Sequence, residues 1–158
     1  MDKYFVTILG IGYSKFAPGT LGSLFGVLFF FSFYNFFYQF PIFLFLLITF
    51  LFLLGWYFTY TYVKKYKIHD PSEIIIDEFI GQLISLCPII ILEYLKINQN
   101  ITLEILIFSF FLFRFFDILK PWPINLIDRS KTSLSILLDD IIAGLFSAII
   151  IIIYITWI

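Results

Sequence analysis

The stretch RFFDILKPWPINLIDRSKTSLSILLDDIIAG, residues 114–144, decides how the rest of the sequence is interpreted. It carries four basic and four acidic residues in a chain that is 61% hydrophobic. Arg114, Asp117 and Lys120 are spaced i, i+3, i+6, so a helix would place all three on roughly one face, about a turn apart. Carboxylates hold hard cations, and cationic side chains hold phosphate groups. The stretch therefore predicts a functional site rather than an ordinary solvated loop.

Two prolines and two aspartates mark the helix ends within this stretch. Pro121 and Pro123 predict that the preceding helix stops, because proline disfavours the α conformation of the residue before it. Asp139 and Asp140 come directly before a new apolar run. We therefore expect two hydrophobic helices joined by a charged loop, with charged groups at both helix ends.

Composition places the chain in a membrane. It has 158 residues, which predicts one domain over 1–158, and a mean hydropathy of +1.02. Only 13% of residues are charged, about half the usual fraction. The net charge of −1 gives no electrostatic reason to expect a nucleic-acid partner. Cys87 is the only cysteine, so a disulfide within the chain is excluded and we interpret it as a packed apolar side chain.

The apolar runs predict an all-α, polytopic integral membrane bundle of about five membrane-embedded helices. The third run is short, at fourteen residues, and contains Pro88. It is either a short or re-entrant segment or a helix that starts near Ile74, which would bring Asp77 and Glu78 within the membrane boundary. The expected segments are 21–40, 42–63, 79–92, 101–119 and 141–158.

A glycine-rich segment, residues 7–20, leads into the first long apolar run. Thr20 or Ser23 could cap the helix that follows. Such a segment at a helix N-terminus also presents free N–H groups to an anion, although a simple entry turn explains the spacing equally well.

The basic residues predict the orientation. If the N-terminus and the second and fourth loops are cytoplasmic, every Lys and Arg except Lys96 lies on the cytoplasmic side. All acidic residues except Glu93 and Glu104 lie there too. The positive-inside rule does not require the acids to follow, so we expect one membrane face to carry a polar site.

Three acidic sets should converge on that face, and a shared cation would relieve their mutual repulsion. Mg²⁺ fits best, because it takes oxygen ligands and accepts substrate phosphates in its shell. Arg114 and Lys120 are candidates to clamp phosphate oxygens. His69, the only histidine, could transfer a proton or be incidental. The sets are Asp77 with Glu78, Asp117 alone or with Asp128, and Asp139 with Asp140.

Motifs of several other chemistries are missing: the sequence has no HExxH pair, no GxSxG elbow and no P-loop lysine motif. The motifs that are present resemble the phosphatidylglycerophosphatase A family of bacterial membrane phosphatases. They occur in the family order and include the specific RxxDxxKPxPI block. One departure is KTSLS at 131–135, where the family usually has a glycine-rich turn. The matching pieces are GIG…APGTLGS (10–23), HD (69–70), IIIDEFIG (74–81), RFFDILKPWPI…DR (114–129) and LLDDIIAG (137–144).

The resemblance implies a single membrane-embedded phosphatase domain in the bacterial cytoplasmic (inner) membrane, multi-pass, with its active site on the cytoplasmic side. It also implies Mg²⁺-dependent hydrolysis of phosphatidylglycerophosphate to phosphatidylglycerol and phosphate. The attacking group, a carboxylate or a metal-bound water, stays open, as does the division of the acids between ligand and base. The implied metal-site or catalytic acids are Asp77, Glu78, Asp117, Asp139 and Asp140, with His69 as a further catalytic candidate. The implied phosphate binders are Arg114 and Lys120, with Arg129 and Thr20 as secondary candidates. Asp128 is a secondary candidate for the site without an assigned role.

Two other classes compete with a phosphatase. A small cation channel or transporter would also carry intramembrane carboxylates. Its site would usually lie near the bilayer midplane, however, whereas these acids gather at one face. Another Mg²⁺-dependent phospholipid phosphotransferase would also use clustered aspartates, but we do not find its usual aspartate-rich helix signature.

Overall fold

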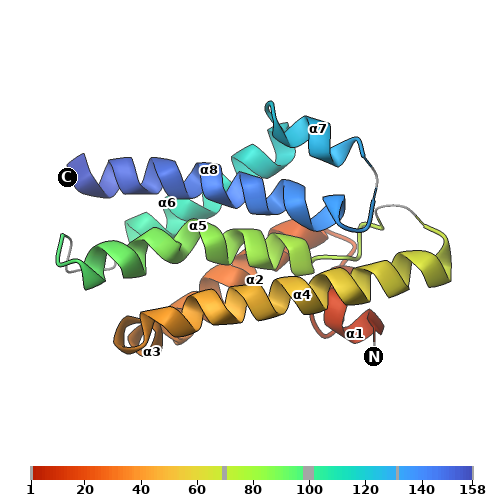
Figure 1. Cartoon of the computed structure of the whole chain (residues 1–158), viewed down its shortest axis with the longest axis horizontal. Coiled ribbons are helices and arrows are strands. Elements are labelled where there is room, and N and C mark those ends of the chain that lie inside the picture. Colours follow the sequence, from red (N-terminus) through yellow and green to blue (C-terminus); the bar gives the residue numbers. More distant parts are fainter. Residues whose placement is uncertain (1, 69–70, 98–101, 131, 158) are drawn as a thin grey trace.

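The computed structural model describes residues 2–68, 71–97, 102–130 and 132–157, and within these ranges the chain is helical and has no strand (Figure 1). The long helices lie side by side along one axis, with the N-terminus at one end of the bundle and the C-terminus at the other. The elements are α1 (Asp2–Val6), η1 (Ile11–Tyr13), α2 (Pro18–Ser32), α3 (Tyr34–Gln39), α4 (Pro41–Tyr66), α5 (Ile76–Tyr94), α6 (Leu103–Leu119), α7 (Ile124–Asp128) and α8 (Ser135–Trp157).

Two helices within the described residues are long and apolar enough to cross a membrane. α4 has 26 residues and α8 has 23, with mean hydropathies of 2.3 and 2.5 in their most apolar windows. Only 17% of that window is buried in α4. A helix at the core of a soluble protein would be largely buried, so the exposed apolar surface of α4 favours contact with lipid.

The first predicted span, 21–40, is wrong as a single helix. The chain forms α2, begins a new helix after Phe33, and continues as α3. No glycine or proline marks this break, and the rings of Phe29 and Phe33 pack across it with centroids 4.8 Å apart. The capping prediction is also wrong: α2 begins at Pro18 with Ala17 as its N-cap, and the Ser23 hydroxyl donates to the Gly19 carbonyl inside the helix.

The third predicted segment is a full helix rather than a short or re-entrant segment, and it starts near Ile74, as the second of the two alternatives predicted. α5 begins at Ile76, continues through Pro88 and ends at Tyr94, which gives 19 residues. It is buried along most of its length and packs most extensively against α8 and then α2. Asp77 and Glu78 therefore lie in the first turn of the central helix of the bundle.

Glycines allow α5 and α8 to approach closely. A Cβ atom added at Gly81 would lie 2.7 Å from the Asp140 carbonyl oxygen and 2.5 Å from Cε2 of Phe113. A Cβ atom added at Gly144 would collide with the Gly81 carbonyl. Small residues at such crossings let helix backbones touch, as they do in membrane helix pairs.

The connection after α6 is shorter than predicted, because α8 begins before the aspartate pair. α6 ends at Leu119, as the prolines predicted, and Lys120 follows in a left-handed conformation with φ 42°. Lys120 is therefore not on the helical face of Arg114 and Asp117, which corrects the i, i+3, i+6 interpretation. A short helix, α7, occupies part of the connection, and α8 begins at Ser135. Its aspartate pair, 139–140, thus lies inside the helix rather than before it.

Candidate active site

Three carboxylates from α5 and α8 form a cluster at one end of the bundle. Asp77, Glu78 and Asp140 each offer an oxygen, and these oxygens all lie within 4.8 Å of one another. Asp77 is 6% and Asp140 is 4% exposed. The glycines one turn further along explain the convergence, because Gly81 follows Asp77 by four residues and Gly144 follows Asp140 by four. In both helices the acid and the glycine share a face, so the contact of the backbones brings the acids together.

No lysine or arginine forms an ion pair with this acidic cluster within the described ranges, although Arg114 lies nearby. The Glu78 N–H donates to Asp77 Oδ1 over 3.1 Å, while Glu78 Oε2 is buried and has no hydrogen-bond partner among the described groups. An oxygen-only donor set with an unsatisfied buried oxygen fits a hard divalent cation such as Mg²⁺.

Arg114 lies next to the acidic cluster, in the C-terminal half of α6. A Cβ atom added at Gly19 would lie 3.2 Å from an Arg114 Nη1 atom and would also collide with the Glu78 carboxylate, so the two charged groups share one small space beside α2. Arg114 Nη1 pairs with Asp117 and reaches the Ser23 hydroxyl at 3.5 Å. Its Nε atom is buried and has no partner among the described residues. Within the described residues, the contacts of the guanidinium group use Nη1 alone, so its other N–H donors remain for a ligand.

Lys120 has two acidic partners on different helices. Its Nζ atom donates to Asp139 of α8 over 2.6 Å and pairs with Asp128 of α7. Burial alone would lower the pKa of Lys120, but the hydrogen bonds to Asp128 and Asp139 raise it above its ordinary value. Lys120 is therefore a firmly charged link between α7 and α8. The second oxygen of Asp139, Oδ1, is buried and unpartnered within the described part of the chain.

The structure separates the residues that the sequence proposed as one site. Asp77, Glu78 and Asp140 come together, with Arg114 and its partner Asp117 beside them. Asp139 and Asp128 belong to the Lys120 group instead. Thr20 lies in the first turn of α2, next to Gly19, and Arg129 is exposed after α7. His69 lies outside the described residues, as does its neighbour Asp70.

Sequence reasoning missed several residues that shape the site. Ser23 was considered only as a helix cap, although it contacts Arg114. A buried polar trio one turn deeper was not identified at all: Gln82 Nε2 donates to Ser85 and Ser109 over 2.9 and 3.0 Å. The glycines of α5 and α8 could have been found, because each follows an acid by four residues in its motif.

The fold and the site define a class: a helical protein with candidate membrane-spanning helices and a buried carboxylate cluster beside an arginine. Comparison with known proteins identifies the particular family. The model of the family described as Phosphatidylglycerophosphatase A matches residues 4–155, and the chain belongs to this family. This result does not favour the channel, transporter or phosphotransferase alternatives.

Matches to named bacterial relatives cover most of the chain. Phosphatidylglycerophosphatase A of Haemophilus influenzae is 34% identical over 137 residues, covering 85% of this chain and 77% of the relative. Phosphatidylglycerophosphatase A of Escherichia coli is 33% identical over 141 residues, covering 88% and 74%. A Bacteroides thetaiotaomicron protein provisionally named as a phosphatidylinositol-3-phosphatase is 30% identical over 149 residues, covering 92% and 87%. No solved structure gives a significant match.

Proposed function

We propose that this chain hydrolyses phosphatidylglycerophosphate to phosphatidylglycerol and inorganic phosphate with the help of Mg²⁺. Its family and the names of its bacterial relatives support the lipid substrate. The observation that carries the proposal is the cluster of Asp77, Glu78 and Asp140 next to the Arg114 guanidinium group. Phosphate-ester hydrolysis needs a metal ion and a group that holds the phosphate. The acids have no ion-pair partner among the described residues and can hold the metal, and Arg114 has free N–H donors for the phosphate.

Each group has a separate task in this proposal. Asp77, Glu78 and Asp140 would hold the Mg²⁺ ion, which when bound polarises the phosphoryl group and lowers the pKa of a water. Arg114 donates hydrogen bonds to the phosphate oxygens while Asp117 fixes the guanidinium plane. The bond between phosphorus and the lipid oxygen breaks, and a new bond to a water-derived oxygen replaces it. Lys120 balances its two acids rather than binding the phosphate.

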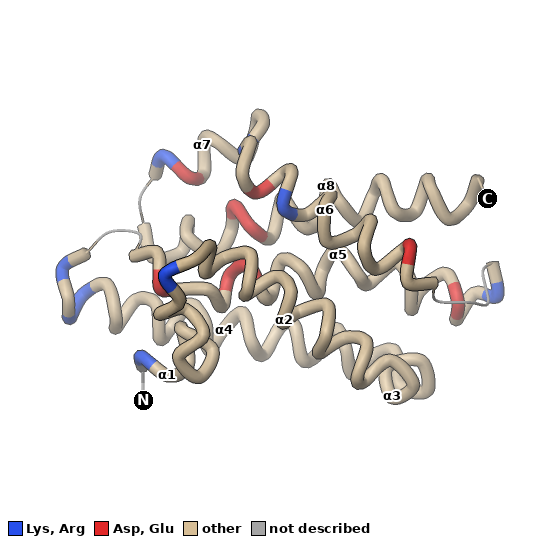
Figure 2. Tube along the Cα trace, turned by 180° about the vertical axis from the view of Figure 1, so that it is seen from behind, with Lys and Arg blue, Asp and Glu red and all other residues tan. Residues whose placement is uncertain are grey.

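We also propose a multi-pass arrangement in the bacterial inner membrane, with the site facing the cytoplasm. Figure 2 supports one polar end, because charged residues gather near α1 and α7 while a smaller group lies at the end nearer α3. α4 reaches the polar end with Lys64 and Lys65 in its last turn. Tyr57 and Tyr60, both exposed, precede them as an aromatic belt would. α5 is roughly 28 Å long at about 1.5 Å per residue, close to a ~30 Å hydrocarbon core.

Phosphate release by the purified protein tests the activity. We expect release from phosphatidylglycerophosphate only with Mg²⁺, and much less from phosphatidic acid or a phosphatidylinositol phosphate. Arg114→Lys keeps the charge but loses the planar fork, so turnover should fall by a factor on the order of 10²–10³, roughly 2.7–4 kcal/mol. Near-normal turnover and Michaelis constant in this variant would rule out the clamp.

Cysteine labelling tests the orientation. Single cysteines at Lys67 and Ser130, both exposed, are introduced in a Cys87→Ser background. An impermeant thiol reagent should label both positions only from the cytoplasmic side. Labelling of the two positions from opposite sides would contradict a site on one membrane face.

A further inference from the structure

An apolar groove runs between α2 and α6 from the site towards the other end of the bundle. It has a volume of about 460 Å³, and all the side chains that line it are apolar. Its open rim is formed by side chains that are 42–71% exposed. These are Leu24, Leu28 and Phe31 of α2 and Leu103, Ile107 and Phe111 of α6.

The groove is continuous with the candidate active site. α2 and α6 meet at the Ser23–Arg114 contact of 3.5 Å. One turn further along each helix, Val27 follows Ser23 and Phe110 precedes Arg114, and both line the groove. Thr20 extends the same stripe of α2, since it precedes Leu24 by four residues. Each apolar stripe therefore ends in polar groups at the site.

The length of the groove matches one leaflet of a bilayer. The part of α6 between Leu103 and Arg114 is roughly 16 Å long at about 1.5 Å of rise per residue. Half of a ~30 Å hydrocarbon core is about 15 Å. A phosphate held at Arg114 would thus place a lipid tail alongside the whole groove.

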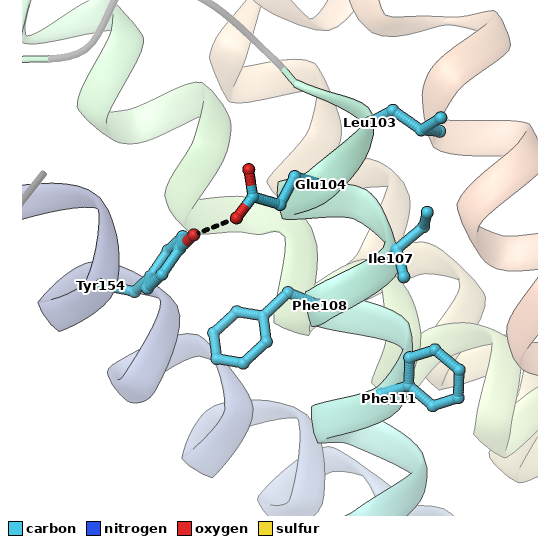
Figure 3. A pocket seen from close by; sticks show the side chains of 6 residues that line it. All are labelled: Leu103, Glu104, Ile107, Phe108, Phe111 and Tyr154. Carbon is cyan, nitrogen blue, oxygen red and sulfur yellow. Dashed lines mark hydrogen bonds between the residues drawn. The ribbon is translucent and has the colours of Figure 1, made fainter.

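A neighbouring surface of α6 differs from this groove. Figure 3 shows Leu103, Ile107 and Phe111 on one side of the helix, whereas Phe108 and Glu104 lie towards Tyr154 of α8. The Tyr154 hydroxyl donates to Glu104 over 2.6 Å, and the rings of Phe108 and Tyr154 lie 4.8 Å apart. That second side lines an open hollow of its own, of about 480 Å³, which shares Leu103, Ile107 and Phe111 with the groove. Only the groove facing α2 also includes Val27 and Phe110, which lie one turn from Ser23 and Arg114, so it is the one that leads to the site.

We infer that the groove between α2 and α6 receives one acyl chain of the phospholipid whose phosphate lies at Arg114. This inference rests on the proposed function, because the phosphate site gives the chain its starting point. Surrounding lipid is as apolar as the groove, so the groove gains little hydrophobic free energy from the chain. Its effect is to orient the substrate, and a small displacement of the reacting group costs a large factor in rate.

A pair of matched substitutions tests the groove by kinetics. Ile107→Trp fills the groove roughly 10 Å from Arg114 along α6. Ile149→Trp makes the same change at an exposed position of α8, where the isoleucine is 54% exposed, against 47% for Ile107. With long-chain phosphatidylglycerophosphate in mixed micelles, we expect kcat/KM to fall about tenfold in Ile107→Trp only. With the dihexanoyl substrate, whose chains are too short to reach Ile107, both variants should match the wild type. Equal rates of Ile107→Trp and wild type on the long-chain substrate would overturn the inference.

Crosslinking to the wild-type protein decides the case if Ile107→Trp fails to fold. The probe is a non-hydrolysable phosphonate analogue of the substrate with a diazirine near the end of one acyl chain. We expect adducts in the peptide containing Phe31, which lines this groove and not the hollow towards Tyr154, and few adducts with phosphatidylcholine of the same chain. Equal labelling by phosphatidylcholine would show that the groove binds bulk lipid. Crosslinks between two copies of the protein would show that the groove is a protein interface. Either result overturns the inference. A wild type that releases no phosphate refutes the proposed function instead, while the crosslinks still report on the groove.

Discussion

Two groups of acids lie at the same end of the bundle and differ in what balances their charge. The first group is the acidic cluster, which has no ion-pair partner among the described residues. In the second, the paired acids, Arg114 balances Asp117 while Lys120 balances Asp128 and Asp139. The adjacent residues 139 and 140 fall in different groups, because successive residues of a helix point about 100° apart. The role of an aspartate in this structure therefore depends on which residues it contacts, not on its residue type.

The two groups have opposite effects on stability before a ligand binds. Like charges that are close together and buried repel one another, so the acidic cluster destabilises the protein until a cation is bound. The paired acids already have their partners, and removing one partner would leave a buried charge uncompensated. A binding site and a structural group can thus be separated by experiment.

The largest effect on turnover should appear when Asp140 is substituted and compared with its neighbour Asp139. Asp140→Asn removes a member of the acidic cluster, and we expect turnover to fall on the order of 10³-fold, about 4 kcal/mol of barrier. Asp139→Asn should cost about tenfold, because Asp139 contacts Lys120 rather than the cluster. Phosphate release under saturating Mg²⁺ measures both.

Thermal unfolding without Mg²⁺ provides the control for this pair. Asp140→Asn should raise Tm, since it removes one of three repelling charges, whereas Asp139→Asn should lower Tm, since Lys120 loses a partner. Shifts of the same sign in both variants would contradict the division into two groups.

A metal titration should give the next largest effect. A cation that binds only the folded protein stabilises it by about 2.7 kcal/mol at a hundred times its dissociation constant. We expect Mg²⁺ to raise the Tm of the wild type and of Asp128→Asn, but not of Asp77→Asn. Asp128 is a fair control because its partner is Lys120 and it is not a member of the acidic cluster. An unchanged wild-type Tm across the Mg²⁺ titration would argue against a metal at the cluster.

Part of this arrangement could be predicted from the sequence. The charged stretch, the proline stop after α6 and the importance of the acid pairs follow from residue type and spacing. The partners of each acid do not, because they depend on packing between helices. Lys120 illustrates this limit: its i+6 spacing from Arg114 suggested a shared face, yet the helix ends one residue earlier and the side chain turns to α7 and α8.

The predicted helix boundaries are wrong where hydropathy was the only signal in the sequence. The break at Phe33 lies in a run of aromatic residues with no glycine or proline. The sequence predicts a start of α8 at residue 141, after the aspartate pair, whereas the helix begins at Ser135 and includes the pair. A helix can contain buried charged residues when neighbouring helices supply their partners or form a site with them. A local sequence pattern does not show which helices are neighbours.

Removing the cation of the paired acids should have a moderate effect. Lys120→Met leaves Asp128 and Asp139 without their shared partner, so we expect the free energy of unfolding to fall by roughly 1.5–3 kcal/mol. Lys120→Arg keeps the charge and should lose less. Denaturant unfolding in detergent measures both, with phosphate release as a second reading. If Lys120→Met lost turnover at unchanged stability, Lys120 would act on the substrate rather than on its two acids.

The smallest effect on stability should come from separating α5 and α8. In Gly81→Ala the new Cβ atom would lie 2.7 Å from the Asp140 carbonyl oxygen, which belongs to a helix backbone and cannot move alone. Overpacking of this kind costs roughly 1–3 kcal/mol, and here the strain should also withdraw Asp140 from Asp77. The Mg²⁺-induced rise in Tm should therefore shrink, while the Lys120 pairs persist. Gly55→Ala is the matched control, because the nearest atoms to its Cβ atom would be side-chain atoms and the tightest contact would be the flexible end of Leu137 at 3.1 Å. If both variants kept the full Mg²⁺ response, close contact between the two backbones would not be what assembles the acidic cluster.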